Sequence, residues 1–391
     1  MRSLCKFAGI VLILLQLGAI VRIGSRLLRT SQGTTIASAD ATATSTHVSV
    51  IVPVLNEEHR LAPCLDGLAG QGPAVTEILV VDGGSIDRTR MVVARATERD
   101  SRVRWIDASP VPSDWNGKAW GLQVGYEHLN QPHDWVLTID ADVRPTVHLV
   151  DSLIAHAAKE RVDAFSVATP QHLSGAAEAI VHPALLASMV IRYGIPGSTF
   201  DDPDEVQANG QCFLIGRDAL ARVGGFASGK DSLVEDVSLA RALAGKGIAP
   251  GFYEPADSTV LLEVEMYSSG WDAWTNWSRS LPMRDASSGR DWWLRMTDMT
   301  LAMALPIPAA MTMLALPNLR RSRVGAGFWM TNLVLLIMRA GLLAGTRRAY
   351  RGAPWTYWLS PLLDPLVAIN LWRKAVRRDH HWRGRPIRRG I

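Results

Sequence analysis

Cysteine is scarce in this chain, and no metal-binding or disulfide spacing accompanies it. The 391 residues contain three cysteines, Cys5, Cys64 and Cys212, which lie far apart in sequence. Without a C-x-x-C pair or a Cys/His ligand spacing, the sequence implies neither a disulfide framework nor a structural zinc site. Such sparse cysteine usage suits a reducing compartment.

A strong charge of one sign is lacking too. The chain has 41 Lys and Arg residues, 37 Asp and Glu residues and a formal net charge of +4, and 48% of its residues are hydrophobic. This balance excludes a disordered or collagen-like chain and leaves enough core for one large domain or two ordinary ones. The excess of positive charge is local, because basic residues crowd the segment 373–391. A basic run after an apolar segment is typical of a cytoplasmic membrane surface, with a solvated tail as the alternative, and we expect no nucleic-acid partner.

Three motifs that would indicate other chemistries are missing. No G-x-x-x-x-G-K-[ST] sequence occurs, which excludes a P-loop. The first apolar strand is followed by Asn56-Glu57-Glu58 rather than by the G-x-G-x-x-G of a dinucleotide site. The run from Gly83 to Asp87 lacks the final glycine of a serine-hydrolase G-x-S-x-G turn.

An apolar run near the N-terminus predicts a membrane anchor. It extends from Phe7 to Val21, has basic residues on both sides and is short for a membrane span. An A-x-A-like site at 37–39 lies too far beyond the run for the usual cleavage of a signal peptide. We therefore predict an uncleaved anchor over residues 1–30, with a signal peptide as the alternative, and a Ser/Thr-rich linker over residues 31–46.

Three further apolar stretches, at about 300–316, 327–345 and 354–372, lie toward the C-terminus. If all three crossed a bilayer, the basic tail would lie on the opposite side from the central domain, contrary to the positive-inside rule. We therefore predict that the first stretch, which is broken by prolines, is interfacial and that the other two cross. Residues 299–372 are then membrane-associated and residues 373–391 form a basic cytoplasmic tail. This organisation predicts a protein of the cell membrane whose catalytic domain is cytoplasmic.

Tryptophan is concentrated in residues 266–298. Trp271, Trp274 and Trp277 recur every three residues and so share one face of a helix. Such a face is typical of an amphipathic segment at a membrane interface, where the ring lies in lipid and its N–H in water. A packed core stripe explains the spacing equally well.

Residues 47–265 have the pattern of a soluble α/β domain. Continuous apolar runs predict strands that are buried on both faces, and helical patterns separate these strands. The predicted strands lie at 48–53, 77–82 and 135–140, and the helices at about 58–68, 88–98 and 119–129. Buried strands alternating with helices predict a mostly parallel sheet, and ligands bind such sheets beyond the carboxyl ends of the strands.

Acidic side chains follow each of these strands. Glu57, Asp82 and the pair Asp140 and Asp142 would converge on one cleft, although a single Asp at a strand end is usually a turn or capping residue. The D-x-D pair offers hard oxygen ligands that suit Mg²⁺ or Mn²⁺, and such an ion would neutralise a diphosphate.

Two later segments carry further candidate side chains. Glu235 and Asp236 precede a helical pattern, where an ionised carboxylate could accept a hydroxyl proton or simply cap the helix. Asn209 and Gln211 flank a glycine before another apolar strand. They could hydrogen-bond substrate hydroxyls or merely close the turn.

The order of these motifs resembles the inverting family 2 glycosyltransferases. The segments VSVIVPVLNEE, ILVVDGGSIDRT, TIDADV and LVEDVSLARAL follow one another over roughly residues 47–240, as in that family. The resemblance implies an α/β nucleotide-diphospho-sugar transferase (GT-A) fold. WNGKAW at 115–120 resembles the hopanoid-associated members, and MYSSGWDAWTNWSRSL at 266–281 resembles the bacterial carotenoid glycosyltransferases, the branch that we favour.

The resemblance also implies roles for individual residues. Pro53 and Glu57 fall where the family holds the uridine, and Asp82 where it hydrogen-bonds the uracil. Asp140 and Asp142 fall on the metal-binding D-x-D, with Asp142 nearer the metal. The remaining implied roles are a diphosphate contact for Lys118, the general base for Asp236, and acceptor-side positions for Asn209, Gln211, Glu235, Trp277 and Arg279.

The resemblance implies single-displacement, inverting transfer of one sugar from a nucleotide-diphosphate sugar, a UDP-hexose, to a hydroxyl of a membrane lipid, a carotenoid. Gly83 replaces the second Asp of the usual V-D-D-G-S motif, which would remove one nucleotide contact. The Q-x-x-R-W of processive relatives is absent, which favours a single transfer. The alternatives are a hopanoid, polyprenyl phosphate or glycerolipid acceptor, a non-catalytic membrane scaffold of the same fold, and a nucleotidyltransferase.

Overall fold

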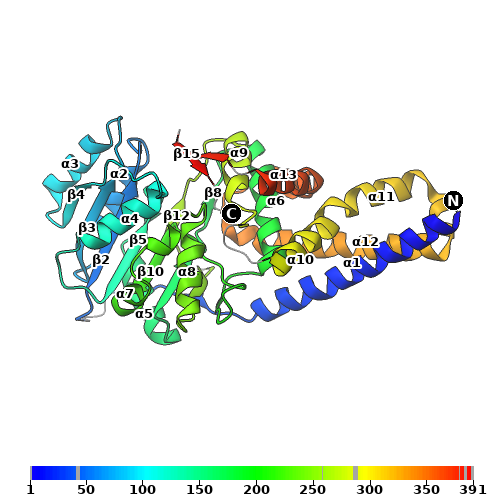
Figure 1. Cartoon of the computed structure of the whole chain (residues 1–391), viewed down its shortest axis with the longest axis horizontal. Helices are drawn as coiled ribbons and strands as arrows, with labels where there is room; N and C mark the ends of the chain where they lie inside the picture. Colours follow the sequence, from blue (N-terminus) through cyan, green and yellow to red (C-terminus); the bar gives the residue numbers. More distant parts are fainter. Residues whose placement is uncertain are drawn as a thin grey trace. The chain divides into compact units, whose positions relative to one another are not determined.

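A computed structural model describes residues 2–40, 45–257, 259–284, 289–377, 379–382 and 385–388 (Figure 1). The chain divides into two compact units. The helical unit comprises residues 1–32, 173–195 and 267–377, and the α/β unit comprises residues 33–172, 196–266 and 378–391. The segment 173–195 thus belongs to the helical unit, although it lies within the stretch 47–265 that we predicted to be one soluble domain.

The α/β unit is built on a mixed, mostly parallel sheet. Its strands are β1 (Thr35–Ile36), β2 (Val48–Val54), β3 (Val75–Asp82), β4 (Val103–Asp107), β5 (Trp135–Ile139), β7 (Ala164–Val167), β9 (Ser198–Thr199), β10 (Cys212–Gly216) and β11 (Gly251–Pro255). Their order is β1-β11-β7-β10-β5-β2-β3-β4, with β9 paired to β11. Strands β2, β3, β4 and β5 run parallel, as the sequence predicts, whereas β10 runs antiparallel to both β5 and β7.

Helices cover both faces of this sheet, which explains the continuous apolar runs in its central strands. The helices are α2 (Leu61–Ala69), α3 (Thr89–Arg99), α4 (Gly117–Glu127), α5 (Leu149–Glu160), α7 (Arg217–Arg222) and α8 (Glu235–Gly245), with a short η1 (Ala227–Gly229). In β2, Val50 and Val52 pack with residues of α2, α3 and α5, whereas Ile51 packs with residues of α4, α7 and α8. Because both faces of the strand are buried, polar and apolar residues do not alternate along it.

A second, smaller sheet follows the D-x-D segment. It contains β6 (Val143–Pro145), β8 (Gln171–His172) and β12 (Leu262–Val264). Strand β12 runs antiparallel to β6 and parallel to β8. Since β6 begins directly after Asp142, this pairing holds one side of the D-x-D turn. Strands β14 (Asp379–Trp382) and β15 (Arg385–Arg388) form a separate antiparallel hairpin, and residues 378, 383, 384 and 389–391 of the predicted basic tail lie outside the described residues.

The helical unit has its own apolar core. Its elements are α1 (Arg2–Thr30), α6 (Ala176–Tyr193), α9 (Gly270–Ser280), α10 (Gly289–Met299), η2 (Thr300–Ala304), α11 (Pro306–Ala315), η3 (Pro317–Arg321), α12 (Arg323–Gly345), η4 (Thr346–Ala349), β13 (Tyr350–Arg351), η5 (Trp355–Leu363) and α13 (Asp364–Val376). Helix α1 packs against α12, and α6 packs against α9 and η5. Polar side chains also join these helices: Gln16 donates to Asn332 at 2.9 Å, and Arg22 pairs with Asp298 at 2.5 Å.

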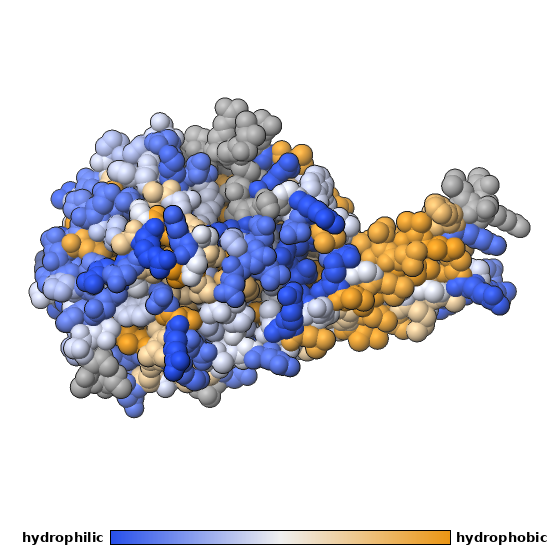
Figure 2. Space-filling view, turned by 60° about the horizontal axis from the view of Figure 1, so that its bottom comes forward, coloured by the Kyte–Doolittle hydropathy of each residue, from blue (hydrophilic) through white to orange (hydrophobic). Residues whose placement is uncertain are grey.

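Three described helices are long and apolar enough to cross a membrane. By length and composition they are Lys6–Thr30, Gly289–Ala315 and Arg323–Ala349. Figure 2 shows hydrophobic residues gathered on the surface of α1, α11 and α12. Exposed apolar side chains on these helices include Phe7, Leu14, Val21, Met311, Leu314, Met330 and Ile337. This surface is consistent with membrane association.

The candidate spans differ from the stretches that we predicted to cross. Residues 354–372 are divided between η5 and α13 and are not among the candidate spans in the described part of the chain. Asp364 of α13 forms a buried ion pair with Arg339 of α12, 2.7 Å apart, so this stretch folds against α12. The stretch predicted to be interfacial, 300–316, instead belongs to a candidate span, because Pro306 starts α11 at a position where its missing N–H is tolerated.

Candidate active site

The loops that follow β2 and β3 are tied to each other. Asn56 accepts a hydrogen bond from the N–H of Ile86 at 2.9 Å, and its own N–H donates to Ser85 Oγ at 2.9 Å. The N–H of Glu57 donates to the hydroxyl of Thr89 at 2.8 Å. Asn56 has a positive φ of 56°, a conformation that asparagine adopts more readily than most residues. The carboxyl ends of these two neighbouring strands therefore form one connected edge.

The residues predicted to hold the nucleotide lie along this edge. Pro53 and Asp82 are on the paired strands β2 and β3, and Glu57 is in the loop after β2. The buried Asp82 closes its own turn, since its Oδ1 accepts from the N–H groups of Gly84 and Ser85 at 3.0 and 2.8 Å. The role of these three residues in nucleotide binding stays a prediction.

Asp140 and Asp142 occupy the turn between β5 and β6. A hydrogen bond from the N–H of Val143 to the carbonyl of Asp140, 3.1 Å long, closes this turn. Burial, and after it the charge of Asp140, raises the pKa of Asp142 well above the usual carboxyl range, although Arg60 opposes the shift. Asp142 Oδ1 is buried and has no hydrogen-bond partner in the described part of the chain. A buried carboxylate oxygen without a partner is costly, and a cation would satisfy it.

The donor set at this turn fits a hard divalent cation such as Mg²⁺ or Mn²⁺. Asp140 and Asp142 supply carboxylate oxygens, and the charge of Glu57 also acts on Asp142. Among the described residues, no three His, Cys, Asp or Glu side chains are already grouped around a common point. A cation held by the two aspartates would keep positions open for phosphate oxygens and water, as magnesium usually does in proteins.

Lys118 joins the D-x-D turn to the second acidic pair. It lies in the first turn of α4, where the Asn116 side chain caps the helix by accepting from the N–H of Lys118 at 3.0 Å. Lys118 Nζ is 2.8 Å from Asp140 Oδ1 and 3.0 Å from Glu235 Oε1. Burial by itself would lower the pKa of Lys118, but the charges of Asp140, Glu235 and Asp236 raise that pKa above its ordinary value. Lys118 therefore remains a cation.

Asp236 is held at the start of α8. Its Oδ2 accepts from the N–H of Gly210 at 2.6 Å, and its Oδ1 accepts from the N–H of Val237 at 2.9 Å. Asp236 lies within the first turn of α8, whose N-cap is Val234, and its contact to Gly210 ties the helix to the segment before β10. Burial, and after it the charge of Glu235, raises the pKa of Asp236 to about 7, while Lys118 opposes the shift. A carboxylate with such a pKa is suited to accept a proton near neutral pH.

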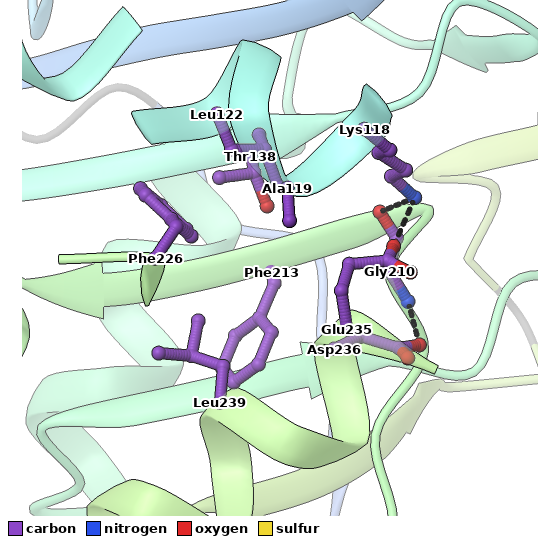
Figure 3. A pocket seen from close by; sticks show the side chains of 10 residues that line it. All are labelled: Lys118, Ala119, Leu122, Thr138, Gly210, Phe213, Phe226, Glu235, Asp236 and Leu239. Atoms are coloured by element: carbon purple, nitrogen blue, oxygen red, sulfur yellow. Dashed lines mark hydrogen bonds and ion pairs between the residues drawn. The ribbon is translucent and has the colours of Figure 1, made fainter. Parts of the chain in front are cut away.

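Lys118, Glu235 and Asp236 line one pocket, which Figure 3 shows from close by. The Gly210 peptide lies between the two charged groups: its N–H donates to Asp236, and its carbonyl accepts from Lys118 Nζ at 3.4 Å. Apolar side chains of α4, β10 and α8 form the other part of the wall. The lining residues are Lys118, Ala119, Leu122, Thr138, Gly210, Phe213, Phe226, Glu235, Asp236 and Leu239.

Asn209 and Gln211 lie on either side of Gly210 and take part in a hydrogen-bond cluster. Asn209 Nδ2 donates to the carbonyl of Val167 and to the hydroxyl of Thr169, both at 3.1 Å. Gln211 Oε1 accepts from the same hydroxyl, and Gln211 Nε2 is buried without a partner in the described part of the chain. The turn-closing alternative accounts for Asn209, whereas Gln211 keeps an unused donor.

The structure places Trp277 and Arg279 in α9 of the helical unit. Trp277 stacks on His182 of α6, with ring centroids 4.2 Å apart. The acceptor-side role of the two residues stays a prediction. Trp274 and Trp277 pack against the core of this unit, whereas Trp271 is 76% exposed. The core-stripe explanation thus describes Trp274 and Trp277, and the amphipathic-face explanation describes Trp271.

Sequence reasoning missed several residues that shape the site. Asn56, Ser85 and Thr89 connect the two loops, and Arg60 pairs with Glu57 at 2.9 Å. Three of the four lie inside the quoted segments VSVIVPVLNEE and ILVVDGGSIDRT, so those motifs already contained the signal. Their roles needed the pairing of β2 with β3, which brings residues about 30 positions apart within hydrogen-bond distance.

Comparison with known proteins defines the class of this domain. Residues 49–224 match the family model described as Glycosyl transferase family 2. The match confirms the resemblance for the first three of the four motifs, because the segment that contains Glu235 and Asp236 lies beyond it. It covers the strands and loops that hold Glu57, Asp82, Lys118 and the D-x-D pair.

Two individual proteins extend the comparison. The chain is 29% identical over 131 residues to 4,4'-diaponeurosporenoate glycosyltransferase of Staphylococcus haemolyticus (strain JCSC1435), and the match covers 33% of each chain. The chain thus spans about a third of the length of that curated relative. Its fold is similar to that of the mannosyltransferase PcManGT from Pyrobaculum calidifontis, solved in complex with GDP-Man and Mn²⁺, with a TM-score of 0.54 and 20% identity. That likeness covers 92% of this chain and 98% of the other, and it confirms the GT-A fold.

Proposed function

We propose that this chain transfers a single sugar from a nucleotide-diphosphate sugar to a hydroxyl of a membrane lipid, with inversion at the anomeric carbon. One observation carries the proposal: Lys118 lines a pocket together with Glu235 and Asp236, and its Nζ also pairs with Asp140 of the D-x-D turn. A departing diphosphate needs a positive charge, and an attacking hydroxyl needs a base. Lys118 offers the first and Asp236 the second, and both line this pocket.

The donor end would be held by the edge formed by β2 and β3 and by the D-x-D turn. Asp140 and Asp142 would hold a divalent cation, whose charge stabilises a departing nucleotide diphosphate. Lys118 adds a fixed positive charge beside Asp140, 2.8 Å from its Oδ1. A UDP-hexose is the donor that the motif resemblance favours.

The acceptor end would depend on Asp236. In a single displacement, the acceptor oxygen forms a bond to the anomeric carbon while the bond from that carbon to the phosphate oxygen breaks. Asp236 takes the hydroxyl proton as the new bond forms, and its raised pKa suits this role near neutral pH. Attack opposite the leaving group inverts the anomeric carbon.

Two observations support a carotenoid as the lipid. The segment 266–281 resembles the bacterial carotenoid enzymes, and the curated relative is named a diaponeurosporenoate glycosyltransferase. The exposed apolar residues of α1, α11 and α12 support a lipid environment. A hopanoid, a polyprenyl phosphate or a glycerolipid remains the alternative acceptor.

Transfer of label into lipid tests the proposal. Membranes that contain the chain are incubated with Mg²⁺ or Mn²⁺, labelled UDP-glucose or other nucleotide sugars, and carotenoid or hopanoid extracts. We expect label in a carotenoid, and loss of that label in both Asp142→Ala and Asp236→Asn. Donor breakdown without lipid labelling would point to another acceptor. Absence of donor turnover with every sugar would favour the scaffold, and pyrophosphate as product would indicate a nucleotidyltransferase.

A further inference from the structure

His182 lies in the middle of α6, inside the helical unit, where no motif drew attention to it. Its side chain is 2% exposed, and burial lowers its pKa to about 3. The imidazole is therefore neutral at physiological pH. A neutral imidazole carries a hydrogen on one nitrogen and a lone pair on the other, so it can donate one hydrogen bond and accept another.

Aromatic rings from three other segments enclose this imidazole. Trp277 of α9 stacks on it with an interplanar angle of 29°, Tyr350 of β13 meets it edge-on with centroids 5.4 Å apart, and Tyr267 lies tilted at 6.2 Å. Tyr350 and Tyr267 are buried, whereas Trp277 is only half-buried. Trp277 is thus the side of the enclosure that lies nearest to the surface of the unit.

Only one nitrogen of His182 has a partner in the described part of the chain. Nδ1 lies 2.9 Å from Tyr350 Oη, and Nε2 is buried with no partner. The buried Tyr350 hydroxyl has no other acceptor among the described residues, so it donates to Nδ1. The tautomer that this leaves carries its hydrogen on Nε2. His182 therefore presents a single, unused N–H donor inside an aromatic enclosure.

A buried donor without a partner is costly, and a ligand oxygen would satisfy it. The rings that contact the imidazole are aromatic, so a matching ligand has one polar oxygen on an otherwise apolar body. We infer that His182 Nε2–H binds a hydroxyl or carboxyl oxygen at the polar end of the lipid acceptor, with Trp277 as the cover. The inference rests on the proposed function, because it names a residue of the helical unit that would select that acceptor.

His156 of α5 provides a matched control within the same chain. It is also buried, its Nε2 also lacks a partner in the described part of the chain, and it also meets aromatic rings. Its neighbours Phe165 and Tyr253 are, however, both fully buried, at 0% and 2% exposure. One of the rings that contact His182, Trp277, is therefore half-buried, whereas both of these rings at His156 are fully buried.

Two substitutions separate the nitrogens of His182. The amide of asparagine reaches the position of Nδ1, and the longer glutamine side chain reaches the position of Nε2. His182→Asn thus keeps a partner for Tyr350 and removes the proposed lipid contact, whereas His182→Gln does the reverse. A purely structural role predicts the opposite ranking, because it depends on the bond to Tyr350.

The probes are a long-chain polyene alcohol, the matching carboxylic acid and the matching hydrocarbon, added without donor to the full-length chain in detergent. Binding is followed by quenching of tryptophan fluorescence. Wild type should prefer the alcohol or the acid over the hydrocarbon, and the preferred probe identifies the kind of oxygen that His182 binds. His182→Asn should weaken that preference about two- to tenfold, the range for one hydrogen bond, while His182→Gln and the same changes at His156 keep it.

Several outcomes would overturn the inference. The first is that wild type shows no preference for the oxygen-bearing probes, and the second is that both His182 variants lose this preference equally. The third is that a variant also loses binding of the hydrocarbon. The fourth is that His182→Asn keeps the preference while His182→Gln loses it. Donor turnover is measured separately on the same preparations. If no donor is consumed while the oxygen preference follows this pattern, the proposed function fails and the lipid site stands.

Discussion

Asp236 and Lys118 have opposite charges, and their neighbours set the protonation of each. Three carboxylates, Asp140, Glu235 and Asp236, act on one buried ammonium group, whose pKa they raise. Burial and the charge of Glu235 raise the pKa of Asp236, whereas the charge of Lys118 lowers it. The sequence placed these residues in separate motifs. Their mutual distances could not be predicted, because they depend on how α4, β10 and α8 meet around Gly210.

Sugar transfer should require ionised Asp236. Because burial and Glu235 raise its pKa to about 7, kcat/KM should fall as the pH drops below that value, about tenfold per unit. Glu235→Gln removes a negative neighbour and should move this acid limb to lower pH, whereas Lys118→Met should move it to higher pH. The measurement is a pH–rate profile at saturating metal. An acid limb near pH 4 in wild type would contradict the raised pKa of Asp236.

Lys118 should contribute mainly to turnover of the donor. We expect Lys118→Met to lower kcat/KM by about a hundredfold or more, since it removes a preorganised cation next to Asp140. Lys118→Arg keeps the charge and should lose less. Initial rates and donor binding by titration provide the comparison. Equal donor affinity and equal rates in wild type and Lys118→Met would contradict the assigned role.

At the scale of elements, local sequence predicted the buried parallel strands but gave no prediction of their order. The runs in β2, β3 and β5 are apolar because helices cover both faces, and this pattern is visible in the sequence. The insertion of β10 antiparallel between β5 and β7 leaves no local pattern. His182 was also invisible, because its partner Tyr350 lies 168 positions away.

Packing of α2 against β6 should fix the D-x-D turn. A Cβ on Gly67 of α2 would lie 2.2 Å from the carbonyl oxygen of Pro145, which no real side chain tolerates. We expect Gly67→Ala to lower the free energy of unfolding by about 1–3 kcal/mol, the usual cost of overpacking. Urea unfolding measures this difference.

Gly245, the last residue of α8, is the control for this substitution. A Cβ there has nothing within 4 Å, so Gly245→Ala should be neutral or slightly stabilising. If Gly67→Ala proved as stable as Gly245→Ala, the close contact between α2 and β6 would not hold the turn.

At the scale of the whole molecule, the helical unit changes the predicted topology. A Cβ on Gly9 of α1 would meet Val324 of α12 at 2.8 Å, so the start of α1 lies beside the start of α12. The other end of α1, at Thr30, leads within three residues into the α/β unit at Gly33. If α1 and α12 cross the membrane, the loop at 320–323 lies on the opposite side from Thr30 at the other end of α1.

Labelling of single cysteines tests this arrangement. In intact cells that carry Cys5→Ser, a membrane-impermeant thiol reagent should label Ser322→Cys, which precedes α12, and should not label Ser31→Cys, which follows α1. Native Cys64 and Cys212 are buried and should stay unlabelled. Equal labelling of both introduced cysteines, before and after permeabilisation, would contradict a crossing by these helices.

The most direct test of the central claim measures donor binding and lipid glycosylation in the same preparation of wild type and Asp236→Asn. The account predicts that both proteins bind the nucleotide sugar with similar affinity in the presence of Mg²⁺ or Mn²⁺. It further predicts that only wild type moves the sugar to the lipid, with inverted configuration at the anomeric carbon. Lipid glycosylation by Asp236→Asn at the wild-type rate, or retention of configuration, would contradict the account.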